Sequence, residues 1–263
     1  MKKYLVIGDP IEHSLSPLLH NYWFKKNNIK AEYDKKKIEK NDLKNLIDKM
    51  KKKELSGINI TVPFKKEIIP FLDKLSPEAK STQSVNTVYL DNGIVVGHNT
   101  DIKGFELAIK DTKYNVEGKS VFILGAGGVV PSIIYALNKM KVSNITLSNR
   151  TLIKAKNLQN LFKNLKIINW GQLPDCDIII NATSLGLDNK DEIKLDFATL
   201  NKNKFFFDVI YNPKETNFLK TAKKLGNNTA NGKKMFIYQA AEAFIIWHGI
   251  YPEINQEIEE LLD

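Results

Sequence analysis

The first hundred residues mix two hydrophobic periods. Apolar residues that alternate with polar ones predict strands, and apolar residues three or four positions apart predict amphipathic helices. The predicted strands of this part cover residues 4–8, 30–37, 57–63, 86–90 and 94–97. The predicted helices cover residues 16–28, 42–53 and 77–82. Asn92 and Gly93 separate the last two strands and are typical of a tight turn, so these strands are predicted to form a hairpin.

The pattern changes after Lys119, where predicted strands and helices alternate. Short apolar runs predict buried strands at residues 121–124, 144–148, 166–168, 178–180 and 205–207. Helical periods predict a helix that ends near residue 140 and further helices at residues 152–162 and 235–248 and, after Pro252, to residue 263. A helix over residues 101–113 is predicted to join the two parts. Strands that alternate with helices indicate an α/β fold with a parallel sheet and right-handed crossovers.

A glycine-rich turn, residues 125–128, connects the first of these buried strands to a helix. Gly125 permits a tight turn, and Gly127 lets the backbone approach a pyrophosphate at the helix N-terminus. The third glycine of the dinucleotide fingerprint is absent, because position 130 is a valine. An ordinary strand–helix turn is the alternative, but the position between strand and helix favours a dinucleotide site.

Arg150 is the only arginine among the 39 basic residues of the chain. It follows the glycine turn by about 22 residues, where a dinucleotide-binding fold places the residue that contacts the adenosine ribose. An acidic residue there selects NAD, whereas the planar fork of arginine matches the 2′-phosphate of NADP. Asn149, Thr151 and Lys154 accompany Arg150, and no acid is present. Chance placement on the surface is the alternative; the sequence predicts NADP(H).

Composition excludes several classes of protein. Of the 263 residues, 43% are hydrophobic and 26% are charged, which is typical of a globular protein. No apolar run reaches the ~18 residues of a membrane span, and the first apolar run is too short for a signal peptide. We therefore expect a cytoplasmic protein without a membrane partner. One cysteine, Cys176, and four scattered histidines predict no metal site and no internal disulfide.

The net charge of +9 raises the possibility of nucleic-acid binding. The lysines are dispersed among acidic residues, and no basic run is interleaved with the aromatic residues that a stacking platform needs. A solvated, lysine-rich surface is therefore predicted, with no nucleic-acid partner.

Short motifs occur in order along nearly the whole chain. They are residues 8–17 with His20 and Asn21, 59–65, 85–88, 97–101 with Gly104, 125–128, 149–151, 181–186, 208–213 with Thr216, and Gly232 with Met235, Gln239 and Ala240. This ordered set resembles the shikimate dehydrogenase family from end to end. Two stretches depart from the family pattern: residues 129–131 after the glycine turn, and Gln83-Ser84 before Val85.

The resemblance implies reversible, NADPH-linked reduction of 3-dehydroshikimate to shikimate in aromatic amino acid (chorismate) biosynthesis. It implies an α/β substrate-binding domain of residues 1–104 and a Rossmann-type, doubly wound NADP-binding domain of residues 105–235. The helices within residues 236–263 are expected to return to the first domain. The expected partners are shikimate and 3-dehydroshikimate, and both a monomer and a homodimer remain open.

The resemblance also implies roles for individual residues. The expected substrate contacts are Ser14, Ser16, Thr61, Lys65, Asn86, Asp101, Tyr211 and Gln239. The expected cofactor contacts are Gly125, Ala126, Gly127, Gly128, Asn149, Arg150, Thr151, Lys154, Thr183, Val209, Gly232 and Met235. Lys65 and Asp101 are the expected catalytic pair.

The chemistry of these residue types suits an alcohol dehydrogenase. Hydride removal from an alcohol needs a base for the hydroxyl proton, and the reverse reaction needs an acid. Either burial makes the Lys65 amine a base, or the protonated amine serves mainly as the acid in the reducing direction. Ser14 and Ser16 face one side if their backbone is extended. The structural alternatives are a surface lysine, a helix N-cap at Asp101, and a helix cap at Ser14 or Ser16.

Two other functions compete with this interpretation. One is a quinate/shikimate dehydrogenase with relaxed cofactor use, which the arginine at position 150 disfavours. The other is a non-catalytic sensor that binds shikimate or NADP without turnover. The presence of both Lys65 and Asp101 disfavours the sensor.

Overall fold

The computed structural model describes residues 1–188 and 192–263, which form two compact units. Unit 1 comprises Met1–Gly104 and Ile237–Asp263, and unit 2 comprises Phe105–Phe236. The boundaries between the units fall within two helices, α4 (Asp101–Asp111) and α8 (Lys233–His248). No helix of the described residues is long and apolar enough to cross a membrane.

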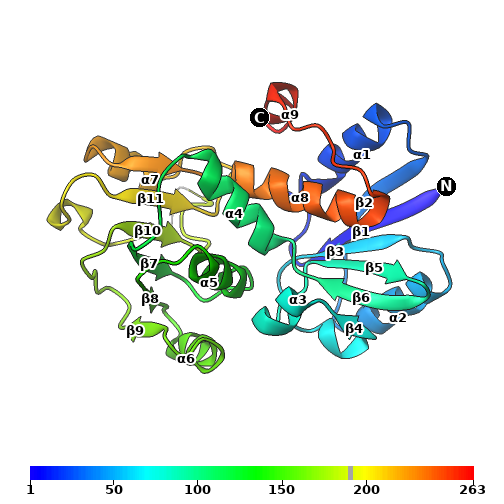
Figure 1. Ribbon diagram of the computed structural model, residues 1–263, viewed down its shortest axis with the longest axis horizontal. Coiled ribbons are helices and arrows are strands. Elements are labelled where there is room, and N and C mark those ends of the chain that lie inside the picture. The colour runs from blue at the N-terminus through cyan, green and yellow to red at the C-terminus, as the bar shows by residue number, and fades with distance from the viewer. Residues whose placement is uncertain (189–191) are drawn as a thin grey trace. The chain divides into compact units, whose positions relative to one another are not determined.

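Unit 1 contains a mixed six-stranded sheet with the order β2-β1-β3-β5-β6-β4 (Figure 1). Its strands are β1 (Lys2–Gly8), β2 (Ala31–Lys37), β3 (Gly57–Ile60), β4 (Lys74–Leu75), β5 (Thr87–Asp91) and β6 (Ile94–His98). β1 runs parallel to β2 and β3, whereas β5 is antiparallel to β3 and β6. The predicted hairpin is confirmed, and both turn residues, Asn92 and Gly93, have positive φ as a type I′ turn requires.

The helices of unit 1 cover this sheet and include the C-terminal segment. They are α1 (Ser16–Lys26), α2 (Asp42–Lys51), α3 (Pro77–Thr82), the one-turn helix η1 (Ile69–Phe71), the second part of α8, and α9 (Gln256–Leu261). The C-terminal segment is tied to the first hundred residues by two indole hydrogen bonds. Trp247 Nε1 donates to Val88 O at 3.2 Å, and Trp23 Nε1 donates to Glu253 O at 3.1 Å.

Unit 2 contains six parallel strands in the order β12-β11-β10-β7-β8-β9. The strands are β7 (Ser120–Leu124), β8 (Asn144–Ser148), β9 (Lys166–Ile168), β10 (Ile178–Asn181), β11 (Phe205–Asp208) and β12 (Asn228–Ala230). The helices are α5 (Val130–Lys139), α6 (Leu152–Leu161), α7 (Asn217–Lys224), the one-turn helix η2 (Phe197–Thr199) and the first part of α8. If β7 is counted as strand 1 of this unit and the sheet is read from the β9 edge, the order is 3-2-1-4-5-6. This is the doubly wound arrangement of dinucleotide-binding folds. The predicted fold class is confirmed.

Several short elements were not predicted from the sequence. α7, β4, β12 and the two one-turn helices fall in stretches that the hydrophobic pattern left unassigned. The helix predicted over residues 101–113 ends at Asp111. The predicted helix at 235–248 begins two residues earlier, at Lys233.

Candidate active site

Lys65 and Asp101 form a buried ion pair in unit 1. Lys65 lies in the turns that follow β3, and its carbonyl oxygen accepts a hydrogen bond from Val85 N at 2.9 Å. Asp101 is the first residue of α4. Lys65 Nζ lies 2.5 Å from Asp101 Oδ2, and the two residues are only 9% and 5% exposed. A charged pair with so little water around it interacts more strongly than a surface pair.

The structural alternatives for these two residues are ruled out by their surroundings. Lys65 is not a surface lysine, because its side chain is enclosed. Asp101 does not cap α4. Instead, Asn99 Oδ1 accepts a hydrogen bond from Asp101 N at 3.1 Å, which leaves the Asp101 carboxylate for Lys65 and Asn86.

Asn86 holds the second oxygen of the Asp101 carboxylate. Asn86 Nδ2 donates to Asp101 Oδ1 and to Thr100 Oγ1, each at 2.9 Å. Asn86 Oδ1 accepts from Thr100 N at 2.7 Å, which fixes the orientation of the amide. Gln239 Oε1 lies 3.5 Å from Asn86 Nδ2, at the outer limit of a hydrogen bond. The structure thus brings together four of the predicted substrate residues: Lys65, Asn86, Asp101 and Gln239.

Ser14, Ser16 and Thr61 also belong to unit 1. The backbone between the two serines is not extended, because Leu15 has φ −88° and ψ 0°, so alternation along a strand does not align them. No side chain caps α1; Ser14 Oγ instead accepts a long hydrogen bond of 3.4 Å from Ser16 N. Thr61 N donates to Ile7 O at 2.9 Å, which keeps Thr61 at the end of β3.

The glycine turn of unit 2 follows β7 and leads into α5 as predicted. Gly125 has φ +109°, and a Cβ there would lie 2.6 Å from Ala182 O, so a side chain does not fit. At Gly127 a Cβ would meet nothing closer than Ala182 O at 3.8 Å, and both Gly127 and Gly128 are exposed. No side chain caps α5. A small, open turn at an uncapped helix N-terminus fits the pyrophosphate of a dinucleotide.

Arg150 lies exposed directly after β8, the neighbour of β7 in the sheet. Asn149 Nδ2 donates to Thr151 O at 2.8 Å and so fixes the turn around Arg150. Lys154 is exposed in the first turn of α6. This segment offers the cations of Arg150 and Lys154 and the hydroxyl of Thr151, and it contains no acidic residue. Such a set fits the 2′-phosphate of NADP.

The loops after β10 and β11 carry Thr183 and Val209. Thr183 N and Oγ1 donate to Asn181 Oδ1 at 3.1 and 2.7 Å. Asn181 Nδ2 donates to Asp208 Oδ1 at 3.0 Å, and Thr216 Oγ1 donates to Asp208 Oδ2 at 2.6 Å. Burial raises the pKa of Asp208, and these hydrogen bonds offset part of the rise. This buried polar network therefore fixes both loops.

The remaining predicted residues of unit 2 lie at the start of α8 and after β11. A Cβ at Gly232 would lie 2.1 Å from Val209 O, so only glycine allows this approach. Met235 is buried, and the Tyr211 ring stacks on Phe236 with centroids 4.8 Å apart.

Buried polar residues to which the sequence assigned no individual role support the predicted ones. Asn59 lies within β3, a strand whose four residues are all buried, and its side chain hydrogen-bonds to Asn86 O and Thr87 Oγ1. Asparagine is rare in buried strands, and this rarity was the available signal. Asp208 is a second such residue, because it directly follows a run of three phenylalanines.

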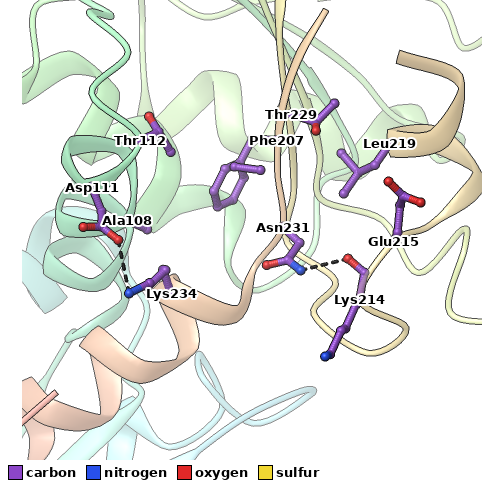
Figure 2. Close-up of a pocket in the computed structure, with 11 residues that line it drawn as sticks. Ala108, Asp111, Thr112, Phe207, Lys214, Glu215, Leu219, Thr229, Asn231 and Lys234 are labelled. Atoms are coloured by element: carbon purple, nitrogen blue, oxygen red, sulfur yellow. Dashed lines mark hydrogen bonds and ion pairs between the residues drawn. The ribbon is translucent and has the colours of Figure 1, made fainter. Parts of the chain in front are cut away.

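A separate cavity of about 330 Å³ lies within unit 2 (Figure 2). It is lined by Ala108, Asp111, Thr112, Phe207, Lys214, Glu215, Leu219, Thr229, Ala230, Asn231 and Lys234. Figure 2 shows Lys234 paired with Asp111 at 3.3 Å and Asn231 Nδ2 donating to Lys214 O at 2.8 Å. None of the predicted site residues lines this cavity.

Metal ligation and the chemistry of the Cys176 thiol concern residues other than Lys65 and Asp101. Among the described residues, no group of histidine, cysteine, aspartate and glutamate side chains is arranged to hold a metal ion. Burial raises the pKa of the Cys176 thiol to about 12, so this thiol is unreactive near neutral pH.

Comparison with known proteins connects this geometry to a family. A family model described as the shikimate dehydrogenase substrate binding domain matches residues 6–88. A second, described as shikimate / quinate 5-dehydrogenase, matches residues 106–222. The shikimate dehydrogenase (NADP(+)) of Pelagibacter ubique is 56% identical over 262 residues, which cover 100% of this chain and 99% of that protein.

Solved structures show the same similarity in three dimensions. The shikimate 5-dehydrogenase of Thermus thermophilus, in complex with NADP(H) and shikimate, has a TM-score of 0.90 and 29% identity, covering 100% of this chain and 98% of that one. The enzyme of Listeria monocytogenes, in complex with shikimate and NAD, has a TM-score of 0.92 and 29% identity, covering 100% and 96%.

Proposed function

Because this chain belongs to the shikimate dehydrogenase family, we propose that it interconverts 3-dehydroshikimate and shikimate with NADP(H) as the cofactor. The observation that carries the proposal is the buried contact between Lys65 and Asp101, to which Asn86 and Gln239 add amide groups in the same unit. The family that the motifs predicted is the family that the comparisons found.

The two units divide the binding roles. We assign the substrate to unit 1, through Ser14, Ser16, Thr61, Lys65, Asn86, Asp101 and Gln239. We assign the cofactor to unit 2, through the glycine turn, residues 149–151, Lys154, Thr183, Val209, Gly232 and Met235. NADP(H), when bound, supplies the hydride donor or acceptor of the reaction. Tyr211 of unit 2 is proposed as a further substrate contact.

The chemical role of Lys65 is proton transfer. In the reduction of 3-dehydroshikimate, the Lys65 ammonium donates a proton to the carbonyl oxygen, and in the oxidation of shikimate the amine, having first released its own proton to solvent, takes that of the reacting hydroxyl. Asp101 orients the amine through its Oδ2 atom, while its Oδ1 atom is held by Asn86. Because both groups are already fixed and largely dry, little reorganisation is needed when substrate binds.

Quinate is a second candidate substrate. The family model that matches unit 2 is described as covering both shikimate and quinate dehydrogenases. The two acids share the ring carboxylate and neighbouring hydroxyls, which the same amide and hydroxyl groups would hold. We propose shikimate as the preferred substrate because the curated relative is named for it.

Removal of the Lys65 amine tests the proposal. We expect the Lys65→Ala variant to lower kcat for shikimate oxidation by about 10³-fold, because general acid–base catalysis contributes on this order. Binding of NADP⁺, measured by isothermal titration calorimetry, is expected to stay unchanged.

The matched control is Lys66→Ala, which removes the adjacent, exposed lysine. This variant is expected to turn over at the wild-type rate. Near-normal turnover of the Lys65→Ala variant, or an equal loss in the two variants, would contradict the proposed role.

A further inference from the structure

Tyr33 is a buried phenol on an otherwise exposed edge strand. Most of β2 is solvent-exposed, yet Tyr33 is only 2% exposed. Its backbone is tied to the Asn21 amide by two hydrogen bonds of 2.8 and 2.9 Å. The His20 ring stacks on the phenol ring with centroids 4.3 Å apart and planes within 1°. The Tyr33 side chain is therefore fixed both along the strand and across its face.

The Tyr33 hydroxyl supports one orientation of the Asn59 amide. It donates to Asn59 Oδ1 at 2.6 Å, and this directs Asn59 Nδ2 toward Asn86 O and Thr87 Oγ1, each at 3.0 Å. A flipped amide would place Asn59 Oδ1 against Asn86 O, two acceptors without a proton between them. The phenol proton and the Asn86 carbonyl thus favour the same one of the two amide orientations.

The contacts continue from Asn59 to the ion pair. Thr87 Oγ1 accepts from Asn59 Nδ2 at 3.0 Å and donates to Asn86 Oδ1 at 3.1 Å. Asn86 Nδ2 then donates to Asp101 Oδ1, which leaves Asp101 Oδ2 for Lys65 Nζ. Every member of this chain is buried, and buried hydrogen bonds in series polarise and constrain one another.

Ser16, one of the predicted substrate serines, lies near the Tyr33 hydroxyl. Burial raises the pKa of Tyr33 well above its usual value, and the Ser16 contact offsets only part of the rise. The phenol therefore remains protonated, and remains a donor to Asn59, across the neutral pH range.

We propose that Tyr33 is a positioning residue that orients the Lys65–Asp101 pair through Asn59, Thr87 and Asn86. This inference rests on the proposed function, because it concerns the orientation of the proposed catalytic pair. Tyr33 itself transfers no proton; it reinforces the direction of the hydrogen bonds that reach Asp101, which the Thr100 N contact to Asn86 Oδ1 also favours.

The Tyr33→Phe variant tests this role, because it keeps the ring and its stack on His20 and removes only the hydroxyl. We expect kcat for shikimate oxidation to fall about ten-fold, the cost of one net hydrogen bond to an oriented group. The limbs of the pH profile of kcat are expected to shift, since the contacts of Asp101 change. The KM for NADP⁺ is expected to stay unchanged.

Tyr4→Phe is the matched control. Tyr4 is equally buried and directly opposite Tyr33 in the strand pair, but the side chain that offsets part of the burial-raised pKa of its hydroxyl is Ser56, outside the chain of contacts described above. We expect kcat to stay within about two-fold of wild type and the pH profile to stay in place. Equal effects of the two substitutions on kcat and on the pH profile would overturn the proposal.

A second variant keeps the proposal testable if Tyr33→Phe does not fold. Thr87→Val has nearly the same shape and breaks the chain of contacts closer to Asn86. It is expected to shift the pH profile in the same direction, and the double variant is expected to lose no more activity than the more severe single variant. An unshifted profile in Thr87→Val, or multiplicative losses in the double variant, would refute coupling through Asn59.

The same assay separates this inference from the proposed function. If the wild-type protein does not oxidise shikimate, the proposed function fails. A different outcome refutes only the role of Tyr33. In that outcome the wild type is active, Lys65→Ala is inactive, and Tyr33→Phe behaves as Tyr4→Phe does.

Discussion

Arg150 lies exposed in the turn between β8 and α6, next to Asn149 and Thr151. The sequence predicted this placement because only one arginine occurs in the chain and it follows the second strand of a βαβ pattern. The structure adds the reason that this segment suits an anion: it is open to solvent and contains no acidic residue.

The Arg150→Asp variant tests the cofactor assignment. We expect the KM for NADP⁺ to rise about 100-fold, because charge-assisted hydrogen bonds to a phosphate are lost and a repulsive charge replaces them. The KM for NAD⁺, which lacks the 2′-phosphate, is expected to change by less than about three-fold. Initial rates with each cofactor at saturating shikimate measure both values.

Lys156→Asp provides the matched control, since Lys156 is an exposed cation on α6, the helix that follows this turn, and the charge change is the same. It is expected to leave both KM values near those of wild type. If Arg150→Asp raised the two KM values equally, recognition of the 2′-phosphate by Arg150 would be refuted.

Buried polar side chains were the least predictable feature at this scale. Lys65 and Asp101 were predicted from their motifs, whereas composition alone favoured a surface lysine at position 65. Tyr33 and Asn59 were not predicted, because their hydrogen bonds join strands that are far apart in sequence. Such contacts become visible only when the register of the sheet is known.

Elements with a strong hydrophobic period were predicted closely. β8 and β9 have the predicted bounds, and α2 buries the predicted stripe of Leu43, Leu46, Ile47 and Met50. These elements have enough apolar residues at one spacing to define a face.

α7 and β12 were missed because their stability depends on their neighbours. α7 buries Phe218, Leu219 and Ala222 on one face, but the helix has only 8 residues, and this is too short for its period to be recognised in the sequence. β12 has three residues with little apolar character and is held by its parallel pairing with β11. The available signal for α7 was Thr216, a residue type that favours the N-cap.

Thr216 connects α7 to the network around Asp208, and its substitution tests that connection. Thr216 Oγ1 accepts from Leu219 N at 3.4 Å and donates to Asp208 Oδ2 at 2.6 Å. We expect Thr216→Ala to lower the free energy of unfolding by about 2 kcal/mol, since a cap and a buried hydrogen bond to a carboxylate are lost.

Urea denaturation followed by circular dichroism measures this change. Thr221→Ala is the control, because Thr221 is exposed on the same helix and alanine favours a helix interior. Its free energy of unfolding is expected to stay within about 0.5 kcal/mol of wild type. An equally small change in Thr216→Ala would contradict the role of the Asp208 network.

For the molecule as a whole, buried histidines are expected to set the stability at acid pH. His20 is fully buried and neither ring nitrogen has a hydrogen-bond partner among the described residues. Burial, and to a smaller extent the charge of His248, lower the pKa of His20 to about 3. Burial lowers the pKa of His248 to about 4.

The direction of the pH dependence follows from these pKa values. In the unfolded chain a histidine binds a proton below about pH 6.5, whereas folded His20 stays neutral until about pH 3. Stability is therefore complete above pH 6.5 and is lost as the pH falls toward 3, by about 1.4 kcal/mol per pH unit for His20. We expect His20→Phe to make the decline between pH 6 and pH 4 shallower by about this amount.

Urea denaturation at several pH values measures that slope. His13→Asn is the control, because His13 is exposed, and it is expected to keep the wild-type slope. An unchanged slope in His20→Phe would show that other groups cause the loss of stability in acid.

The function of the whole molecule is tested most directly by cofactor reduction. Purified protein is mixed with shikimate or quinate and with NADP⁺ or NAD⁺, and the near-ultraviolet absorbance of the reduced cofactor is followed. We predict the highest kcat/KM for shikimate with NADP⁺. Preferential reduction of NAD⁺, preferential oxidation of quinate, or no reduction by the folded protein would contradict an NADP-dependent shikimate dehydrogenase.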